Sequence, residues 1–247
     1  MTSAVPHPSV GGPWPAPRLR ALQVEELFRF SGVSAAYSYF GALLTLGVLF
    51  EVSTDHTPAA AWFVAATLLA VLRGILVVAY RRRPPESDPS RYARLAIVAN
   101  LFAGVLWGIL GTVLFPAGPV YAQLFVVMVI ICFVAGSVTA YSAVEGAHEA
   151  LSIPATIPTA AFLFFMRDGM HWYAGVAALF FCFAIVYYAR QLHTHLEAGF
   201  LAQRIVLLRD GQILQLGSLA SLYEAPADPF VTRFVRAQTY ALPWSPP

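Results

Sequence analysis

The pattern of apolar and polar positions consists of long apolar runs separated by short polar breaks. Six runs come close to the roughly 20 residues that a helix needs to cross a membrane. They lie at residues 33–52, 59–80, 94–115, 120–141, 147–166 and 170–189. Pro154 and Pro158 interrupt the fifth run, which a membrane helix tolerates when neighbouring helices satisfy the freed carbonyls. The pattern predicts an all-α transmembrane bundle of about six spans over residues 20–189.

The polarity changes after residue 189. In residues 190–204, Leu192, Leu196 and Phe200 recur at a spacing of four on an otherwise polar stretch. This spacing is typical of an amphipathic helix. We therefore expect an exit helix that continues from the last span into the cytoplasm.

Residues 205–238 predict a small α+β appendage. The apolar runs 205–208 and 213–216 flank an Asp-Gly pair, which is a strong hairpin signal. Ser218 is placed to cap a helix that runs through Glu224. Asp228 followed by a proline predicts a second helix that runs to about residue 238.

Composition supports the membrane assignment. Hydrophobic residues make up 58% of the 247 positions and charged residues 11%, whereas soluble domains are roughly a quarter charged. Most of the exterior must therefore face lipid. The two ends, 1–19 and 239–247, are rich in proline and are expected to be disordered tails.

The basic residues predict the orientation. All fifteen are arginine. They precede the first run, follow the second and follow the sixth, and only Arg167 lies between runs on the opposite side. Because cytoplasmic loops carry the excess of arginine, both termini are expected to be cytoplasmic. Trp62 and Trp172 fall where an outer interfacial belt is expected. The arginines form no basic face on a folded domain, so nucleic-acid binding is not expected.

Several landmarks punctuate the apolar sequence. They are Arg73 with Arg81–Arg83, the GVLWG string at 104–108, Phe115-Pro116, Ala135-Gly136, Pro154 with Pro158, and the ARQL string at 189–192. With these landmarks, residues from about 20 to 203 resemble the multi-helix membrane input domain found ahead of bacterial diguanylate cyclases and sensor histidine kinases. The resemblance implies a bacterial inner-membrane protein that takes part in signal transduction.

A second resemblance begins where the first ends. The strings RIVLLRDGQI at 204–213 and QLGS at 215–218, with PADPFV at 226–231, are similar to the C-terminal end of an ABC-transporter ATP-binding subunit. The chain has no G-x-x-x-x-G-K-[ST] loop to cradle phosphates, so ATP hydrolysis and other enzymatic activity are not expected. No cofactor is expected either.

Arg73 is the clearest functional candidate. An ionisable group inside a span is costly and faces a partner or a wet cavity. We expect its partner to be Glu149 or Glu145, and snorkelling to the membrane surface is the alternative. Trp107, in the GVLWG landmark, completes the ligand or signal candidates with Arg73 and Glu149.

Gly104, Gly108 and Gly111 predict a small-residue packing face. Such faces let helix backbones approach closely, either within the bundle or between protomers. Pro154 and Pro158 are predicted to serve helix packing as well.

The remaining polar residues suggest weaker sites. Glu145 and His148 have the E-x-x-H spacing of di-iron bundles, but no second such motif accompanies them. Four residues fall on the outer side of the bundle, where they could meet as a metal or proton sensor. They are Asp55, His56, Asp168 and His171. No metal site is expected.

These observations predict a membrane-embedded signal-input module that lacks its catalytic output domain and that could act as a homodimer. Two alternatives remain open. In the first, the chain is a membrane protein whose C-terminal fragment docks with ABC-transporter subunits. In the second, it is a nonfunctional gene fusion.

Overall fold

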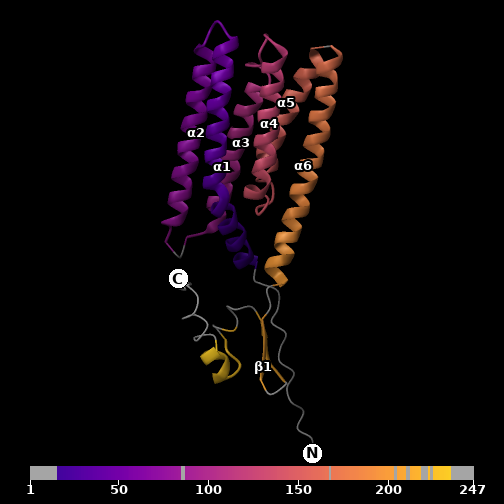
Figure 1. Ribbon diagram of the computed structural model, residues 1–247. Coiled ribbons are helices and arrows are strands. Elements are labelled where there is room, and N and C mark those ends of the chain that lie inside the picture. Colours follow the sequence, from indigo (N-terminus) through magenta and orange to yellow (C-terminus); the bar gives the residue numbers. More distant parts are fainter. Residues whose placement is uncertain are drawn as a thin grey trace, which may run out of the picture. The chain divides into compact units, whose positions relative to one another are not determined.

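A computed structural model describes residues 16–84, 87–166, 168–202, 205–209, 212–217, 222 and 225–234. The chain divides into two units, one formed by residues 20–196 and the other by residues 1–19 with 197–247. The larger unit is a bundle of helices that run side by side, with α2 at one edge and α6 at the other (Figure 1). The helices are α1 Ala16–Val52, α2 Thr57–Arg81, α3 Pro89–Leu110, α4 Val120–Tyr141, α5 Glu149–Phe165 and α6 Gly169–Ala202.

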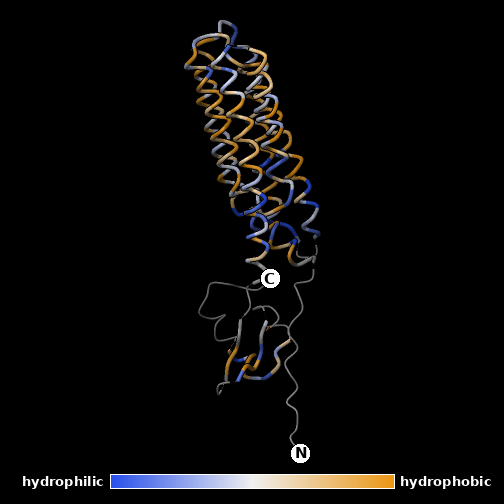
Figure 2. The backbone as a smooth tube through the Cα atoms, turned by 90° about the vertical axis from the view of Figure 1, so that its right-hand side faces the viewer, coloured by the Kyte–Doolittle hydropathy of each residue, from blue (hydrophilic) through white to orange (hydrophobic). Residues whose placement is uncertain are grey.

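Five of these helices are long and apolar enough to cross a membrane. They are α1, α2, α3, α4 and α6, and hydrophobic residues run along most of the bundle, with hydrophilic ones gathered toward its ends (Figure 2). The chain thus has the helices of a multi-pass membrane protein, as predicted. The fifth apolar run forms α5, whose 17 residues are fewer than the roughly 20 that a span needs.

The bounds of helices α1 and α3 differ from the predicted ones. Helix α1 begins at Ala16, inside the segment predicted as a tail, and Leu27 and Phe28 are buried in the bundle. Helix α3 begins at Pro89, because the carboxylate of Asp88 caps its first turn by accepting from the N–H of Ser90 at 2.9 Å. It ends at Leu110, five residues before the predicted end.

Helices α3 and α5 form the most extensive helix–helix contact of the described residues. The glycine face of α3 lies in this contact, within one chain. A Cβ built on Gly104 would lie 2.4 Å from the carbonyl oxygen of Leu151, and one built on Gly111 would lie 1.9 Å from Oγ1 of Thr159. Only glycine therefore allows the two backbones to approach this closely.

The prolines of α5 belong to the same contact. Pro158 has no N–H, so the carbonyl of Pro154, four residues earlier, lacks its helical donor. This carbonyl faces Gly108, where an added Cβ would lie 2.2 Å from its oxygen. The Cα hydrogens of Gly108 can therefore cover an acceptor that would be costly to expose to lipid.

Trp107 lies at the centre of the core, with 2% of its surface exposed. Its ring stacks on Phe133 with centroids 4.7 Å apart and meets the edge of Trp62 at 5.5 Å. Trp62 is buried and donates its indole N–H to the carbonyl of Leu106 at 2.8 Å. Its predicted place in an interfacial belt was wrong, because this internal acceptor satisfies the indole inside the bundle.

Helix α6 continues without interruption from Gly169 to Ala202, so the last span and most of the predicted exit helix are one element. In the smaller unit, β1 Ile205–Arg209 pairs antiparallel with β2 Gln212–Gly217, which confirms the predicted hairpin. Residues 229–234 are helical. The N–H of Phe230 donates to the carboxylate of Asp228 at 2.7 Å, as expected of a capping residue. The predicted helix 218–224 lies outside the described residues, apart from Leu222.

Candidate functional site

Arg73 lies inside the bundle with 6% of its surface exposed. Its Nη2 donates to Oδ1 of Asn100 at 3.1 Å and to the hydroxyl of Tyr141. The guanidinium carbon also lies 5.3 Å from the centroid of the Tyr141 ring. A cation over an aromatic face gains electrostatic stabilisation when it is desolvated.

The predicted carboxylate partner of Arg73 was wrong. None of the ion pairs among the described residues involves Arg73, and Glu149 pairs instead with Arg190, with Oε1 and Nε 3.0 Å apart. The reason is geometric, because the start of α5 faces α6, whereas α3 and α4 supply the groups around α2's arginine. The guanidinium is thus a buried positive charge whose described partners are neutral.

A chain of hydrogen bonds runs outward from Arg73 in two directions. Because arginine can only donate, the Tyr141 oxygen accepts from it, and the Tyr141 hydroxyl donates onward to Oγ of Ser34 at 2.9 Å. In the other direction, Nδ2 of Asn100 donates to the carbonyl of Ala147 at 2.9 Å. The charge network therefore joins the first four helices to the loop between α4 and α5.

The cavity beside Arg73 is small. It encloses about 10 Å³ and includes Ser31, Leu76 and Ala96 in its lining. Such a volume holds about one water molecule. The guanidinium itself therefore has room for water but not for a larger ligand.

The loop that Asn100 holds also contacts α6. Arg190 pairs with Glu149 directly after this loop, and Nδ1 of His193 lies 2.9 Å from the carbonyl oxygen of Ser142. Between the loop and α6 is an open pocket of about 490 Å³ that includes Glu145 in its lining. Two polar contacts thus hold the start of the exit segment, one to the α4–α5 loop and one to the first residue of α5.

His148, in the same loop, is 1% exposed. Ser137 donates its hydroxyl to the carbonyl of Val134 at 2.7 Å, so its oxygen is left to accept from Nδ1 of His148 at 3.1 Å. Nε2 of His148 is buried and has no hydrogen-bond partner among the described residues. Burial lowers the pKa of His148 to about 4, so the imidazole is neutral at physiological pH.

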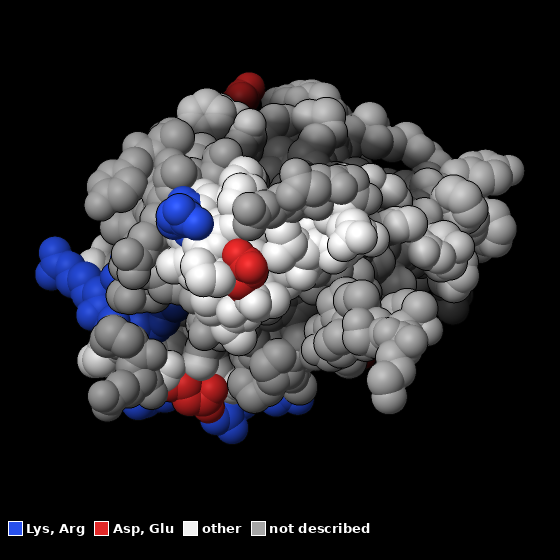
Figure 3. All heavy atoms as spheres, turned by 90° about the horizontal axis from the view of Figure 1, so that it is seen from below, with Lys and Arg blue, Asp and Glu red and all other residues white. Residues whose placement is uncertain are grey.

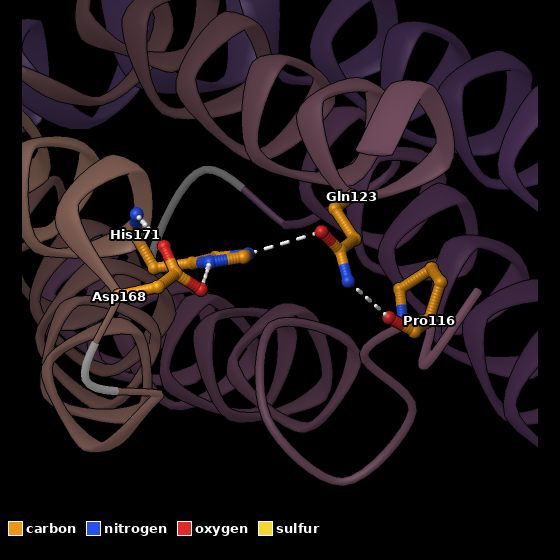
Figure 4. A network of polar contacts seen from close by, with 4 residues as sticks. All are labelled: Pro116, Gln123, Asp168 and His171. Carbon is orange, nitrogen blue, oxygen red and sulfur yellow. Dashed lines mark hydrogen bonds and ion pairs between the residues drawn. The ribbon is translucent and has the colours of Figure 1, made fainter. Parts of the chain in front are cut away.

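A second polar network lies at the other end of α6 (Figure 4). Nδ1 of His171 is 2.5 Å from Oδ2 of Asp168, and its Nε2 is 3.0 Å from Oε1 of Gln123. The amide nitrogen of Gln123 donates in turn to the carbonyl of Pro116 at 3.0 Å. Hydrogen bonds from the backbone and side chain of His171 lower the pKa of Asp168.

The structure brings together only half of the predicted outer group. Asp168 and His171 meet, whereas Oδ1 of Asp55 accepts from the N–H of Thr57 at 2.9 Å and His56 stacks on a phenylalanine of α1. Within the described part of the chain, no group of three or more His, Cys, Asp or Glu could hold a metal ion.

Arginines mark one end of the bundle. Arg81, Arg82 and Arg83 follow α2 or end it, Arg91 and Arg94 lie in the first turns of α3, and Arg190 lies on the exit segment of α6. Seen from below, arginine side chains gather at the edge of the described surface (Figure 3). Arg167, on which the predicted charge asymmetry also depends, lies outside the described residues.

Sequence reasoning identified Arg73 but not the residues that surround it. Asn100 and Gln123 carried a usable signal, because an amide inside an apolar run needs a partner. Tyr141 and Ser34 gave none, since both residue types are common in membrane helices without any such role.

No protein-family model, curated protein or solved structure matches the chain. The two resemblances therefore rest on sequence motifs alone.

Proposed function

We propose that this chain is a signal-input module of the bacterial inner membrane, with six spans and both termini in the cytoplasm. One observation carries the proposal: a buried charge in the membrane bundle is connected by hydrogen bonds to the loop that holds the exit segment of α6. Within a membrane, a buried ionisable residue is by default a functional site.

The connection has three steps. Arg73 donates to Asn100, and Asn100 donates to the carbonyl of Ala147. The loop that contains Ala147 contacts α6 through Ser142, and Glu149, the first residue of α5 after this loop, pairs with Arg190 of α6. A change in the partners of Arg73 would therefore alter the contacts that position the base of α6.

Six spans are supported by the surroundings of α5. Its 17 residues would extend about 26 Å at 1.5 Å per residue, which is close to the thickness of the hydrocarbon core. Pro154 and Pro158 interrupt its internal hydrogen bonds, but the freed carbonyl of Pro154 is covered by α3. Such a helix suits the interior of a bundle better than its lipid-facing surface.

The orientation is supported by the arginines that gather where α2 ends and α3 begins, and by Arg190 on α6. Reporter fusions test it. Alkaline phosphatase joined after residue 83 or residue 202 should be inactive, because it would remain in the cytoplasm, whereas a fusion after residue 55 should be active. The reverse pattern would contradict the orientation.

Spin-label distances test the coupling. Labels at Arg82→Cys and His195→Cys, with Cys132 and Cys182 replaced by alanine, report the position of α6 relative to α2. Asn100→Asp keeps an acceptor for Arg73 but loses the donor to Ala147, so we expect a shifted or broader distance distribution.

Thr112→Val is the matched control for this measurement. Among the described residues, the Thr112 hydroxyl bonds only to carbonyls at the end of the preceding helix, those of Gly108 and Ile109, so the distribution should match that of the parent protein. An unchanged distribution in Asn100→Asp would contradict the proposed coupling.

The docking alternative is favoured by the smaller unit, in which a paired hairpin and the buried residues Leu207, Leu222 and Val231 form a packed cluster. A pull-down from native membranes separates the two functions. The docking alternative predicts that full-length protein retains an ABC ATPase or permease and that a chain cut after Gln203 loses it. If the chain is an input module, neither the full-length protein nor the shortened chain should retain these subunits. Crosslinks between copies along residues 190–204 would test a homodimer.

A further inference from the structure

A pocket of about 470 Å³ lies between α1 and α4, on the side of the bundle. Trp107 of α3, buried and stacked on Phe133, contributes to its lining. Helix α1 contributes Ser34 and Gly41, and α4 contributes Gly136. The volume falls in the range of small-molecule sites.

The pocket opens toward lipid. Tyr37 and Phe40 of α1, which also line it, are 75% and 60% exposed in the bundle. Since α1 and α4 are both candidate spans, hydrocarbon surrounds these side chains. A molecule that enters the pocket sideways would therefore come from the lipid phase.

One polar group in the pocket has an unused donor. Ser31 and Thr45, also on α1, donate their hydroxyls to the carbonyl four residues earlier. Ser34 is 7% exposed and accepts from Tyr141, but it donates no hydrogen bond to any described residue. Its hydrogen is thus available to an acceptor in the pocket.

This donor is the end of a chain that begins at a cation. Arg73 donates to Tyr141, which donates to Ser34. Each donor in such a chain polarises the next, so the Ser34 hydroxyl becomes a stronger donor than an isolated serine. The charge of Arg73, which has no carboxylate partner among the described residues, also favours electron-rich oxygen nearby.

We infer that this pocket binds a lipid-phase molecule that has an apolar body and a hydrogen-bond acceptor oxygen. The oxygen accepts from Ser34, and the body lies against Trp107 between α1 and α4. The inference rests on the proposed function, for which it names the chemical class of the stimulus. A carboxylate and a neutral carbonyl share this chemistry, and competitors distinguish them.

Photolabelling tests the pocket in the full-length protein, reconstituted in phosphatidylcholine nanodiscs. The probe is palmitic acid with a diazirine at mid-chain, and labelled peptides of α1 and α4 are quantified. We expect saturable labelling that palmitic acid displaces and hexadecane, which has no oxygen, does not. Displacement by methyl palmitate as effective as that by palmitic acid would assign a neutral carbonyl, and weaker displacement would assign a carboxylate.

Three variants locate the site. Ser34→Ala should raise the half-saturating concentration roughly fivefold, the loss of one hydrogen bond. Gly136→Leu should abolish saturable labelling, because no atom of a described residue lies within 4 Å of an added Cβ there and the side chain can enter the pocket. Gly74→Leu, at an equally open position on α2, should label like the parent protein.

Equal displacement by hexadecane, or parental labelling of Gly136→Leu, would overturn the inference. Labelling does not depend on the position of α6, so this failure would contradict the pocket alone. An unchanged distance between residues 82 and 195 in Asn100→Asp would instead contradict the input module.

Discussion

Nε2 of His171 lies 3.0 Å from Oε1 of Gln123, and this atom can only accept. The Gln123 amide cannot be reversed without placing its oxygen against the carbonyl of Pro116, to which its nitrogen now donates. Nδ1 of the same ring faces the carboxylate of Asp168. Both ring nitrogens of His171 therefore face acceptor oxygens, and the Asp168 carboxylate and the Gln123 amide together orient the ring.

This relationship predicts that Gln123 holds the ring of His171 in place. Gln123→Leu removes the amide that faces Nε2, so in protein labelled with ¹⁵N-histidine the ring-nitrogen signals of His171 should shift and broaden. His171→Gln assigns the signals. Unchanged signals in Gln123→Leu would show that the two side chains do not meet as described.

Asp168 predicts an acid-dependent loss of the same network. Its pKa is lowered, chiefly by the backbone N–H of His171, so the folded state favours the charged carboxylate. A lowered carboxyl pKa gives stability that is present above the ordinary value of 3.8 and is lost as the pH falls through the folded value. Thermal melts should therefore show a decline below about pH 4 that Asp168→Asn reduces.

His148 predicts a pH dependence at higher pH. Its pKa falls from 6.5 to about 4 on folding, so the unfolded chain binds the proton more readily. Stability should be fully present above pH 6.5 and decrease as the pH falls toward 4. Between pH 7 and pH 5 the loss should be about 2 kcal/mol.

His148→Asn is the control for this effect, because asparagine does not titrate. Melts of the variant should lose most of the decline between pH 7 and pH 5, and an undiminished decline would assign it to another group.

The contact between α3 and α5 predicts that one added methyl group strongly lowers the stability of the protein. Gly108→Ala would place a carbon 2.2 Å from the carbonyl oxygen of Pro154. Because backbone cannot yield cheaply, unfolding of the purified protein should become easier by about 2 kcal/mol. Gly136→Ala, where space is open, should change it by less than about 0.5 kcal/mol. Equal effects would mean that the helices do not meet as described.

The ion pair at the base of α6 predicts a different outcome. The Arg190 side chain is 72% exposed, so Arg190→Gln should change unfolding stability by less than about 1 kcal/mol. It should nevertheless increase the mobility of a spin label at Thr194→Cys, since the contact to the first residue of α5 is lost. An unchanged spectrum would show that Glu149 does not restrain this segment.

The sequence by itself determined the membrane helices and the hairpin. Apolar runs near the length of a span leave few other folds, and an Asp-Gly pair between two apolar runs specifies a tight connection. The same reasoning identified Arg73 and the glycines of α3 as unusual. A charge inside a span is costly unless it has a partner, and a row of small residues indicates close helix packing.

Only the tertiary structure decided what these residues contact. Which helix faces another depends on rotation about each helix axis, which an almost uniformly apolar sequence does not encode. Arg73 therefore donates to Asn100 and Tyr141 and not to the carboxylate that its charge suggested. The Trp62 side chain points into the bundle, where a backbone carbonyl of α3 accepts its indole N–H. The Ser34 hydroxyl, which donates to no described residue, could be recognised only once Tyr141, which donates to its oxygen, and the pocket beside it had positions.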